Sequence, residues 1–147
     1  MTTEAIQFRR DFWTQYAQLY PEDGVSAGWG RAYTWIPVGS TGLNVSLAVY
    51  HWGAGLWLRG GRGESLTEAA SRIQAYKDAF RQALHETFDR RFPGGPGTQW
   101  INLEGGFDAR RDFEVSDREN WPDMAAWLHY MLHIYLRVIA RAPVPGS

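Results

Sequence analysis

The stretch SLTEAASRIQAYKDAFRQALHETFDRR, residues 65–91, decides the fold of this chain. It opens on the pattern of a capping box, in which the Ser65 hydroxyl accepts a hydrogen bond from the backbone N–H of Glu68 and the Glu68 side chain reaches back to Ser65. Apolar residues then recur at helical spacing on one side, from Leu66 to Phe88. The pattern predicts one helix from Ser65 to Arg91, roughly 40 Å long, which the run FPGGPG at 92–97 ends.

Strand and helix signals flank this segment on both sides. Helices are predicted at 4–20 and 119–141. Alternating apolar residues and glycine turns predict strands at 31–38, 43–52 and 56–59 before the long helix, and at 98–104 and 107–115 after it. The order α-β-β-β-α-β-β-α predicts an α+β fold, a five-stranded, mainly antiparallel sheet with long helices packed on one face. We expect a single domain over 1–147, with a loose tail at 142–147.

The composition is that of a soluble globular protein, because 44% of the 147 residues are hydrophobic and 21% are charged. The formal net charge of −1 argues against a protein that holds nucleic acid mainly by electrostatic attraction. Cysteine is absent, which excludes disulfides, thiolate nucleophiles and Cys-ligated zinc. The first residues lack the pattern of a signal peptide, and the most apolar segment, 124–140, is too short and too polar for a membrane span. We therefore expect a cytoplasmic protein with no membrane partner.

Aromatic residues are unusually frequent, with 8 Trp, 7 Tyr and 7 Phe. In the three strands before the long helix, the aliphatic residues of strand 43–52 share one face, so alternate residues share the other. The outward positions are occupied by Tyr33, Trp35, Tyr50, Trp52 and Trp57. Three interpretations stay open: the first helix covers these rings, they form an interface with a second copy or another protein, or they stack on nucleic-acid bases or a small ligand.

The glycine-rich approach to the long helix, at 60–63, is a second candidate site. A helix N-terminus favours anions, and an anion bound there would meet Arg59, Arg62 and Ser65. The glycine spacing matches neither the phosphate loop of nucleotide hydrolases nor a dinucleotide-binding fingerprint. Turn glycines are therefore the simpler interpretation of this segment.

A histidine pair lies in the closing helix. His129 and His133 are four residues apart and share a helix face, so that with a carboxylate they could ligate zinc. The glutamate that metalloproteases place between two such histidines is missing. We interpret the pair as structural and predict no metal and no cofactor.

Charged residues alternate along the last strand, where Asp108, Arg110, Asp112 and Glu114 share one face. They could bind a metal ion or a basic partner, but a solvated face with charges that pair among themselves is the simpler interpretation. A nuclease of the common restriction type would need an Asp/Glu-x-Lys pair, and the only lysine, Lys77, has no acidic residue two positions before it. No catalytic residue is predicted.

Several packing residues follow one another as they do in a known family. The matching features are Phe12-Trp13, Leu56-Trp57-Leu58, Trp100-Ile101, Asp117 with Trp121-Pro122, and Trp127. By these features the chain resembles DUF4268, a bacterial domain of unknown function found alone or beside restriction-endonuclease-like regions. The resemblance implies a setting in bacterial DNA restriction or defence, and it carries over no functional residues.

The sequence thus predicts a non-catalytic binding or assembly module rather than an enzyme. The expected partner is a second copy, as a homodimer, or another protein, through the five outward rings. One alternative is a metal-assisted or anion-binding hydrolase that uses Arg59, Arg62 or the face of strand 107–115. The other alternative is a protein that binds single-stranded nucleic acid on the sheet aromatics.

Overall fold

The computed structural model of the protein describes residues 3–39, 41–88, 99–102 and 104–141. In this part of the chain the helices are α1 (Thr3–Leu19), α2 (Leu66–Gln74), α3 (Lys77–Phe88) and α4 (Trp121–Arg141), with short 3₁₀ turns η1 (Pro21–Asp23) and η2 (Arg118–Asn120). The strands are β1 (Tyr33–Val38), β2 (Leu43–Tyr50), β3 (Gly53–Arg59), β4 (Gln99–Asn102) and β5 (Asp108–Asp112). The expected α+β class and antiparallel sheet are confirmed.

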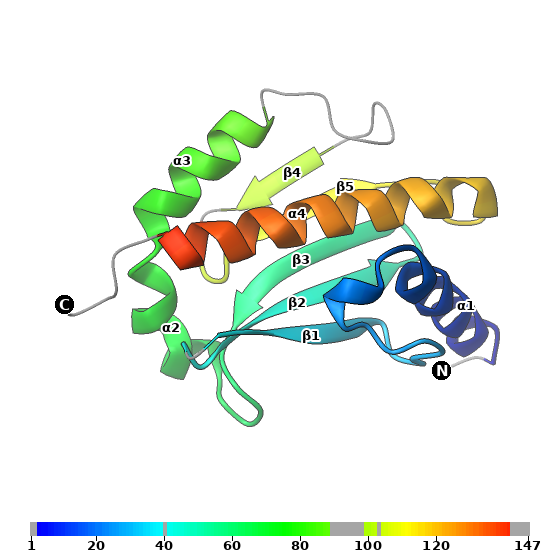
Figure 1. Cartoon of the computed structure of the whole chain (residues 1–147), viewed down its shortest axis with the longest axis horizontal. Helices are drawn as coiled ribbons and strands as arrows, with labels where there is room; N and C mark the ends of the chain where they lie inside the picture. Colours follow the sequence, from blue (N-terminus) through cyan, green and yellow to red (C-terminus); the bar gives the residue numbers. More distant parts are fainter. Residues whose placement is uncertain (1–2, 40, 89–98, 103, 142–147) are drawn as a thin grey trace.

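The strands form one sheet in the order β1-β2-β3-β5-β4. Each neighbouring pair is antiparallel. The first three strands form a meander, and β5 then adds beside β3, so that β4 lies at the outer edge (Figure 1). The insertion of β5 between β3 and β4 places its charged residues next to the middle of the sheet.

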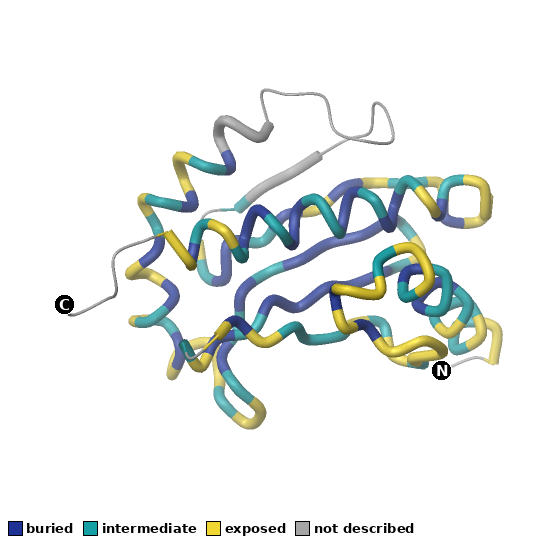
Figure 2. The backbone as a smooth tube through the Cα atoms, viewed as in Figure 1, coloured by how far each residue is buried: buried dark blue, intermediate teal, exposed yellow. Residues whose placement is uncertain are grey.

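The core lies between the sheet and α4, which runs along β2 and β3 (Figure 1). Alternate residues of β2 and β3 point into it and are at most 2% exposed: Leu43, Val45, Leu47, Val49, Ala54, Leu56 and Leu58. The helix α1 packs beside α4, where Phe12 meets Trp121 with ring centroids 5.9 Å apart. Figure 2 shows buried backbone along β2, β3 and the inner side of α4.

Three aromatic side chains tie the helices to the segments that flank β1 and β5 through hydrogen bonds. Trp13 Nε1 donates to the carbonyl of Arg31 over 2.9 Å, and Trp121 Nε1 donates to the carbonyl of Val115 over 2.9 Å. The hydroxyl of Tyr135 donates to the carbonyl of Phe107. Each bond satisfies the polar end of a ring whose body fills the core. This accounts for part of the aromatic excess, but not for the rings on the other side of the sheet.

The single long helix expected over 65–91 is wrong, because the chain turns between α2 and α3. Ser65 does cap α2, since its Oγ accepts a hydrogen bond from the N–H of Glu68 over 3.1 Å. At the break, the N–H of Tyr76 bonds to the carbonyl of Ile73, three residues back, which tightens the turn. The break lets Ile73, Tyr76 and Phe80 all reach the core around the end of the sheet. The positions 89–98, with the predicted stop at 92–97, and the tail at 142–147 lie outside the described residues.

Several strand boundaries also differ from the sequence prediction. The strand β2 ends at Tyr50, so that Trp52 lies in the turn to β3, and β5 ends at Asp112, so that Glu114 lies after it. The strand β3 begins at Gly53, within residues 53–55, which were predicted to form a turn. Gly53 pairs with Asp112 of β5. A Cβ at Gly53 would lie 2.2 Å from the backbone oxygen of Arg111, so only glycine lets the two strands approach this closely. Phe107 does not begin the last strand, because its positive φ of 58° makes it part of the turn before Asp108.

Candidate functional site

One face of the sheet is built from rows of register partners that cross the strands. Trp35, Ser46 and Trp57 form one row across β1, β2 and β3. The next row contains Tyr33, Ala48, Gly55 and, on β5, Arg110. Because side chains alternate along a strand, these rows point away from the residues that pack on α4. None of the five predicted rings belongs to the core on the helix side.

The five rings lie where the sequence placed them, and α1 does not cover them. Phe12, Trp13 and Tyr16 of α1 are buried in the core on the side of α4. Tyr33 is 39% exposed, and Trp35, Tyr50, Trp52 and Trp57 are half-buried. The interpretation in which the first helix covers the rings therefore does not apply.

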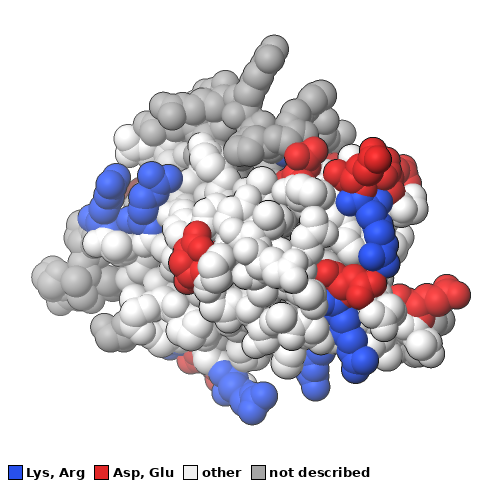
Figure 3. Space-filling model, turned by 45° about the vertical axis from the view of Figure 1, so that its right-hand side comes forward, with Lys and Arg blue, Asp and Glu red and all other residues white. Residues whose placement is uncertain are grey.

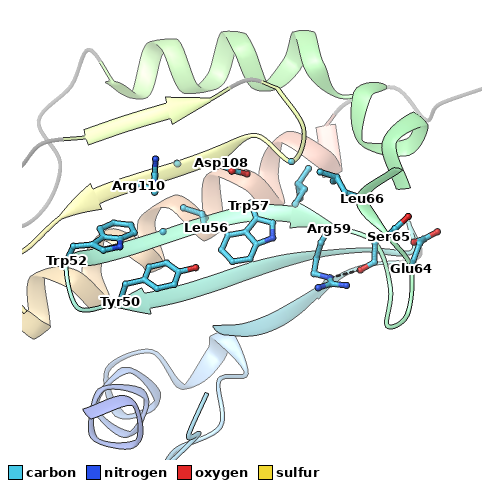
Figure 4. Close-up of a pocket in the computed structure, with 15 residues that line it drawn as sticks. Tyr50, Trp52, Leu56, Trp57, Arg59, Glu64, Ser65, Leu66, Asp108 and Arg110 are labelled. Atoms are coloured by element: carbon cyan, nitrogen blue, oxygen red, sulfur yellow. Dashed lines mark hydrogen bonds between the residues drawn. The ribbon is translucent and has the colours of Figure 1, made fainter. Parts of the chain in front are cut away.

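The open face contains a hollow of about 780 Å³ (Figure 4). Tyr50, Trp52 and Trp57 line it from β2, β3 and the turn between them, Arg110 and Asp108 line it from β5, and Leu66 lies at the α2 end. Gly55, the register partner of Arg110, also lines the hollow, and its missing side chain leaves room between the rings. An apolar hollow with a few charged groups at its margin has the composition of a binding site.

Arginine side chains pair with the rings of this face. The guanidinium carbon of Arg59 lies 3.5 Å from the ring centroid of Trp35, and that of Arg110 lies 5.5 Å from the ring of Trp52. Tyr50 and Trp52 stack with centroids 5.0 Å apart. A cation over an aromatic face is attracted by the ring quadrupole. Arg59 therefore covers one face of the Trp35 ring, and Arg110 lies farther from the ring of Trp52.

Two buried polar atoms on this face lack a hydrogen-bond partner among the described residues. They are the Oγ of Ser46, whose residue is fully buried, and the Nε1 of Trp35, its register partner. A buried donor or acceptor without a partner costs free energy, about 1–3 kcal/mol for each group.

The residues of the second candidate site, the glycine-rich segment before α2, come together only in part. Arg59 and Ser65 line the same hollow, whereas Arg62 is exposed and does not line it. Glu64 lies between them, bound to Arg72 and to the N–H of Gly61. The hydrogen bonds from Arg72 and Gly61 hold the pKa of Glu64 below its usual range, so this segment already carries a negative charge, which opposes the binding of an anion there.

The residues of β5 do not form the uniform solvated face that the alternation predicted. Asp108 lines the hollow half-buried, and burial raises the pKa of its carboxyl above the usual range. Arg110 and Asp112 are exposed on the same face. Arg111 lies on the opposite face and is only 1% exposed, with its guanidinium carbon 4.8 Å from the ring of Phe113. Burial lowers the pKa of Arg111, and Asp123 of α4 acts in the opposite direction.

A second cluster lies on the helix side, where α4 meets η1. His129 Nδ1 lies 2.7 Å from Oδ2 of Asp23, and His133 Nε2 lies 2.8 Å from Oδ1 of the same carboxylate. The hydroxyl of Tyr16 donates to Oδ2 of Asp23 over 2.7 Å. Burial raises the pKa of Asp23, but the hydrogen bonds from His129, Tyr16 and His133 outweigh it and bring the pKa below the usual range.

Sequence reasoning found the two histidines of this cluster and missed Asp23. The carboxylate lies in the segment after α1, 106 residues before His129 and 110 residues before His133. The four-residue spacing of His129 and His133 places two possible metal ligands on one helix face, but it does not indicate where a third ligand would come from. Nothing in the sequence selects Asp23 from the other acidic residues, because the docking of α1 on α4 brings it there.

The charges on the helix side do not form a continuous basic surface among the described residues. Figure 3 shows acidic and basic groups mixed around the margin of the side that it presents, with a mostly uncharged middle. Arg118 and Asp11, for example, pair across the two ends of the chain with N and O atoms 2.8 Å apart. This side of the molecule therefore lacks the clustered charge that nucleic-acid backbones require.

Comparisons with known proteins identify no relative of this chain. No family model, no curated protein and no solved structure matches the chain. The likeness to DUF4268 thus stays a prediction of the sequence. Among the described residues, no helix combines the length and the apolar character needed to cross a membrane.

Proposed function

We propose that this protein is a non-catalytic binding and assembly module that forms a homodimer through the open face of its sheet. The observation that carries the proposal is the set of exposed or half-buried rings, Tyr33, Trp35, Tyr50, Trp52 and Trp57, on a face outside the chain's own core. Trp and Tyr are typical anchors of protein interfaces, because they bury a large area and still satisfy a polar end.

The charges of this face favour a second copy as the partner. Arg59 and Arg110 are accompanied by Asp108 and Asp112, so that the two signs are balanced. A twofold interface is formed by the same surface on both subunits, and it must therefore be complementary to itself. A face with balanced charges around apolar rings meets this requirement, whereas a face of one sign would repel its copy.

The biological setting of the proposal comes from the resemblance to DUF4268. It suggests that the assembly acts in bacterial DNA restriction or defence. The genes beside this one provide a test of this setting that does not involve the dimer. Neighbouring restriction or defence genes in several genomes would support it, and their consistent absence would contradict it.

The oligomeric state is the direct test of the proposal. We expect the wild-type chain to sediment with twice the 16.8 kDa mass of one chain, and to dissociate on dilution. Trp57→Ala should weaken the dimer about tenfold or more, which corresponds to about 1.4 kcal/mol. Leu19→Ala, on the exposed side of α1, is the matched control and should leave the dimer unchanged.

Two outcomes would contradict the homodimer. One is a wild-type chain that stays monomeric at high concentration. The other is a folded Trp57→Ala variant that associates as strongly as the wild type, which would place the interface elsewhere. Circular dichroism of each variant shows whether the fold is retained.

Single-stranded nucleic acid is the second candidate, and one observation favours it. Arg59 lies over Trp35 and Arg110 lies near Trp52, so cations and rings lie beside one another on the open face, as they do where bases stack. Titration with an oligonucleotide at low salt should then quench tryptophan fluorescence, and Arg110→Ala should weaken the binding. Unchanged fluorescence would exclude this candidate. The hydrolase alternative stays a prediction, and His129 and His133 lie on the helix side, away from the hollow.

A further inference from the structure

The cluster of Asp23, His129 and His133 is outside the assembly face, and the homodimer gives it no role. Asp23 lies on η1, and its side chain is 1% exposed. The histidines lie one turn apart on α4, with 25% of the His129 side chain and 43% of the His133 side chain exposed. The carboxylate is therefore held at the bottom of a site that opens to solvent along the histidine rings.

The ligand atoms of the three residues converge. One atom from each, an oxygen of Asp23 and a ring nitrogen of each histidine, all lie within 4.8 Å of one another. A tetrahedral ion at about 2.0–2.2 Å from each atom needs the ligand atoms roughly 3.4 Å apart. The hydrogen-bonded distances, 2.7 Å from His129 Nδ1 to Oδ2 of Asp23 and 2.8 Å from His133 Nε2 to Oδ1, are shorter than that. An ion that replaces the shared protons must therefore move the two rings slightly away from the carboxylate.

Neighbouring side chains fix the orientation of these ligands. Tyr16 donates a hydrogen bond to the carboxylate of Asp23. The ring of Tyr20 stacks on His129, with centroids 3.9 Å apart and planes 7° apart. The other nitrogen of His129, Nε2, lies 3.9 Å from Glu22. Such outer contacts orient metal ligands in proteins and contribute to metal affinity.

We propose that Asp23, His129 and His133 bind one divalent transition-metal ion, with Zn²⁺ as the representative of the class. Two imidazole nitrogens and one carboxylate oxygen suit Zn²⁺, Co²⁺ and Fe²⁺ better than Mg²⁺ or Ca²⁺, which prefer oxygen ligands alone. Three protein ligands leave coordination positions for water on the solvent side. The ion joins the segment after α1 to α4, since its ligands come from both.

The test uses the full chain without a histidine tag, after treatment with a chelator. Titration with Zn²⁺ by calorimetry should show one ion per chain, and Co²⁺ should give visible absorption bands of a nitrogen- and oxygen-ligated site. In His133→Gln and His129→Asn, the side-chain amide places an N–H where the histidine nitrogen faced Asp23, but an amide nitrogen does not ligate a metal ion. Each should weaken Zn²⁺ binding by more than the 10–100-fold that loss of an outer contact causes.

The same variants separate metal binding from a purely hydrogen-bonded role. His51→Gln is the control, because His51 is exposed in the turn between β2 and β3 and should leave the affinity unchanged. Near-ultraviolet circular dichroism verifies that each variant is folded. A folded wild type that binds neither Zn²⁺ nor Co²⁺ would overturn the proposal, and so would folded histidine variants with wild-type affinity.

Discussion

The two faces of the sheet are made by alternate residues of the same strands, yet they carry different side chains. The helix-covered face is aliphatic, with Leu47, Leu56 and Leu58 fully buried. The open face carries Trp35 and Trp57 with small residues and arginines between them. The aliphatic face is explained by folding, because it supplies the core. The aromatic face contributes little to that core, so its composition needs a second explanation, and the proposed dimer would supply one.

Neighbouring residues of β3 give the strongest test of this difference. Leu56 points to the core and Trp57 to the open face. Leu56→Ala should lower the free energy of unfolding by about 2–5 kcal/mol, because it removes buried methyl groups and leaves a cavity. Trp57→Ala should cost less, about 1–2 kcal/mol, since part of the ring stays in water and its removal leaves no closed cavity.

Urea unfolding of both variants, at a concentration where the chain is monomeric, measures the two values. A dimer would add stability that depends on concentration, which is why the monomeric range is required. If Trp57→Ala costs as much as Leu56→Ala, the ring belongs to the core and the contrast between the faces fails.

A smaller effect is expected from the cation on the open face. Arg59→Met keeps the long apolar stem and removes the charge that lies 3.5 Å from the ring centroid of Trp35. The loss should be about 0.5–1 kcal/mol, the usual value of a cation over an aromatic ring near the surface. Thermal unfolding measures it. Arg62→Met, in the exposed loop that follows, is the control and should change stability by less than about 0.5 kcal/mol.

Local patterns predicted the elements that depend on local physics. The Ser65 cap follows from a serine three residues before a glutamate, and its hydrogen bond to the N–H of Glu68 is present. The alternation of β2 predicted which residues of the sheet lie in the core. The outward position of Tyr33, Trp35, Tyr50 and Trp57 follows from the same alternation, whereas Trp52 lies in the turn after β2. These parts could be predicted because each depends on residues within one element.

Other parts depend on packing between distant segments. The break between α2 and α3 has no proline or glycine to mark it, and it is set by the core around Tyr76 and Phe80. The meeting of Asp23 with His129 and His133 requires α1 and α4 to dock first. Arg111 is different. It lies two residues after the buried Ala109 and so points to the same side of β5, which means that the strand alternation already predicted its burial.

The smallest expected effect concerns the acid of the hollow. Burial raises the pKa of Asp108 above its usual value of 3.8. A carboxyl whose pKa is raised on folding is harder to ionise in the folded state, so it lowers stability once the pH rises above the unfolded value. Asp108→Asn should therefore stabilise the monomer near neutral pH, by a few tenths of a kcal/mol, as is usual for substitutions outside the core.

This gain should disappear as the pH falls below about 3.8, where the wild-type carboxyl is protonated in both states. Urea midpoints of the two chains between neutral and acid pH measure the difference. A gain that persists in acid would show that the asparagine acts through packing, and a loss near neutral pH would show that the carboxylate is stabilised in the hollow. The second result would matter for recognition, because an acid that is costly to ionise alone becomes favourable when a partner's cation, such as Arg59 or Arg110 of a second copy, is placed beside it.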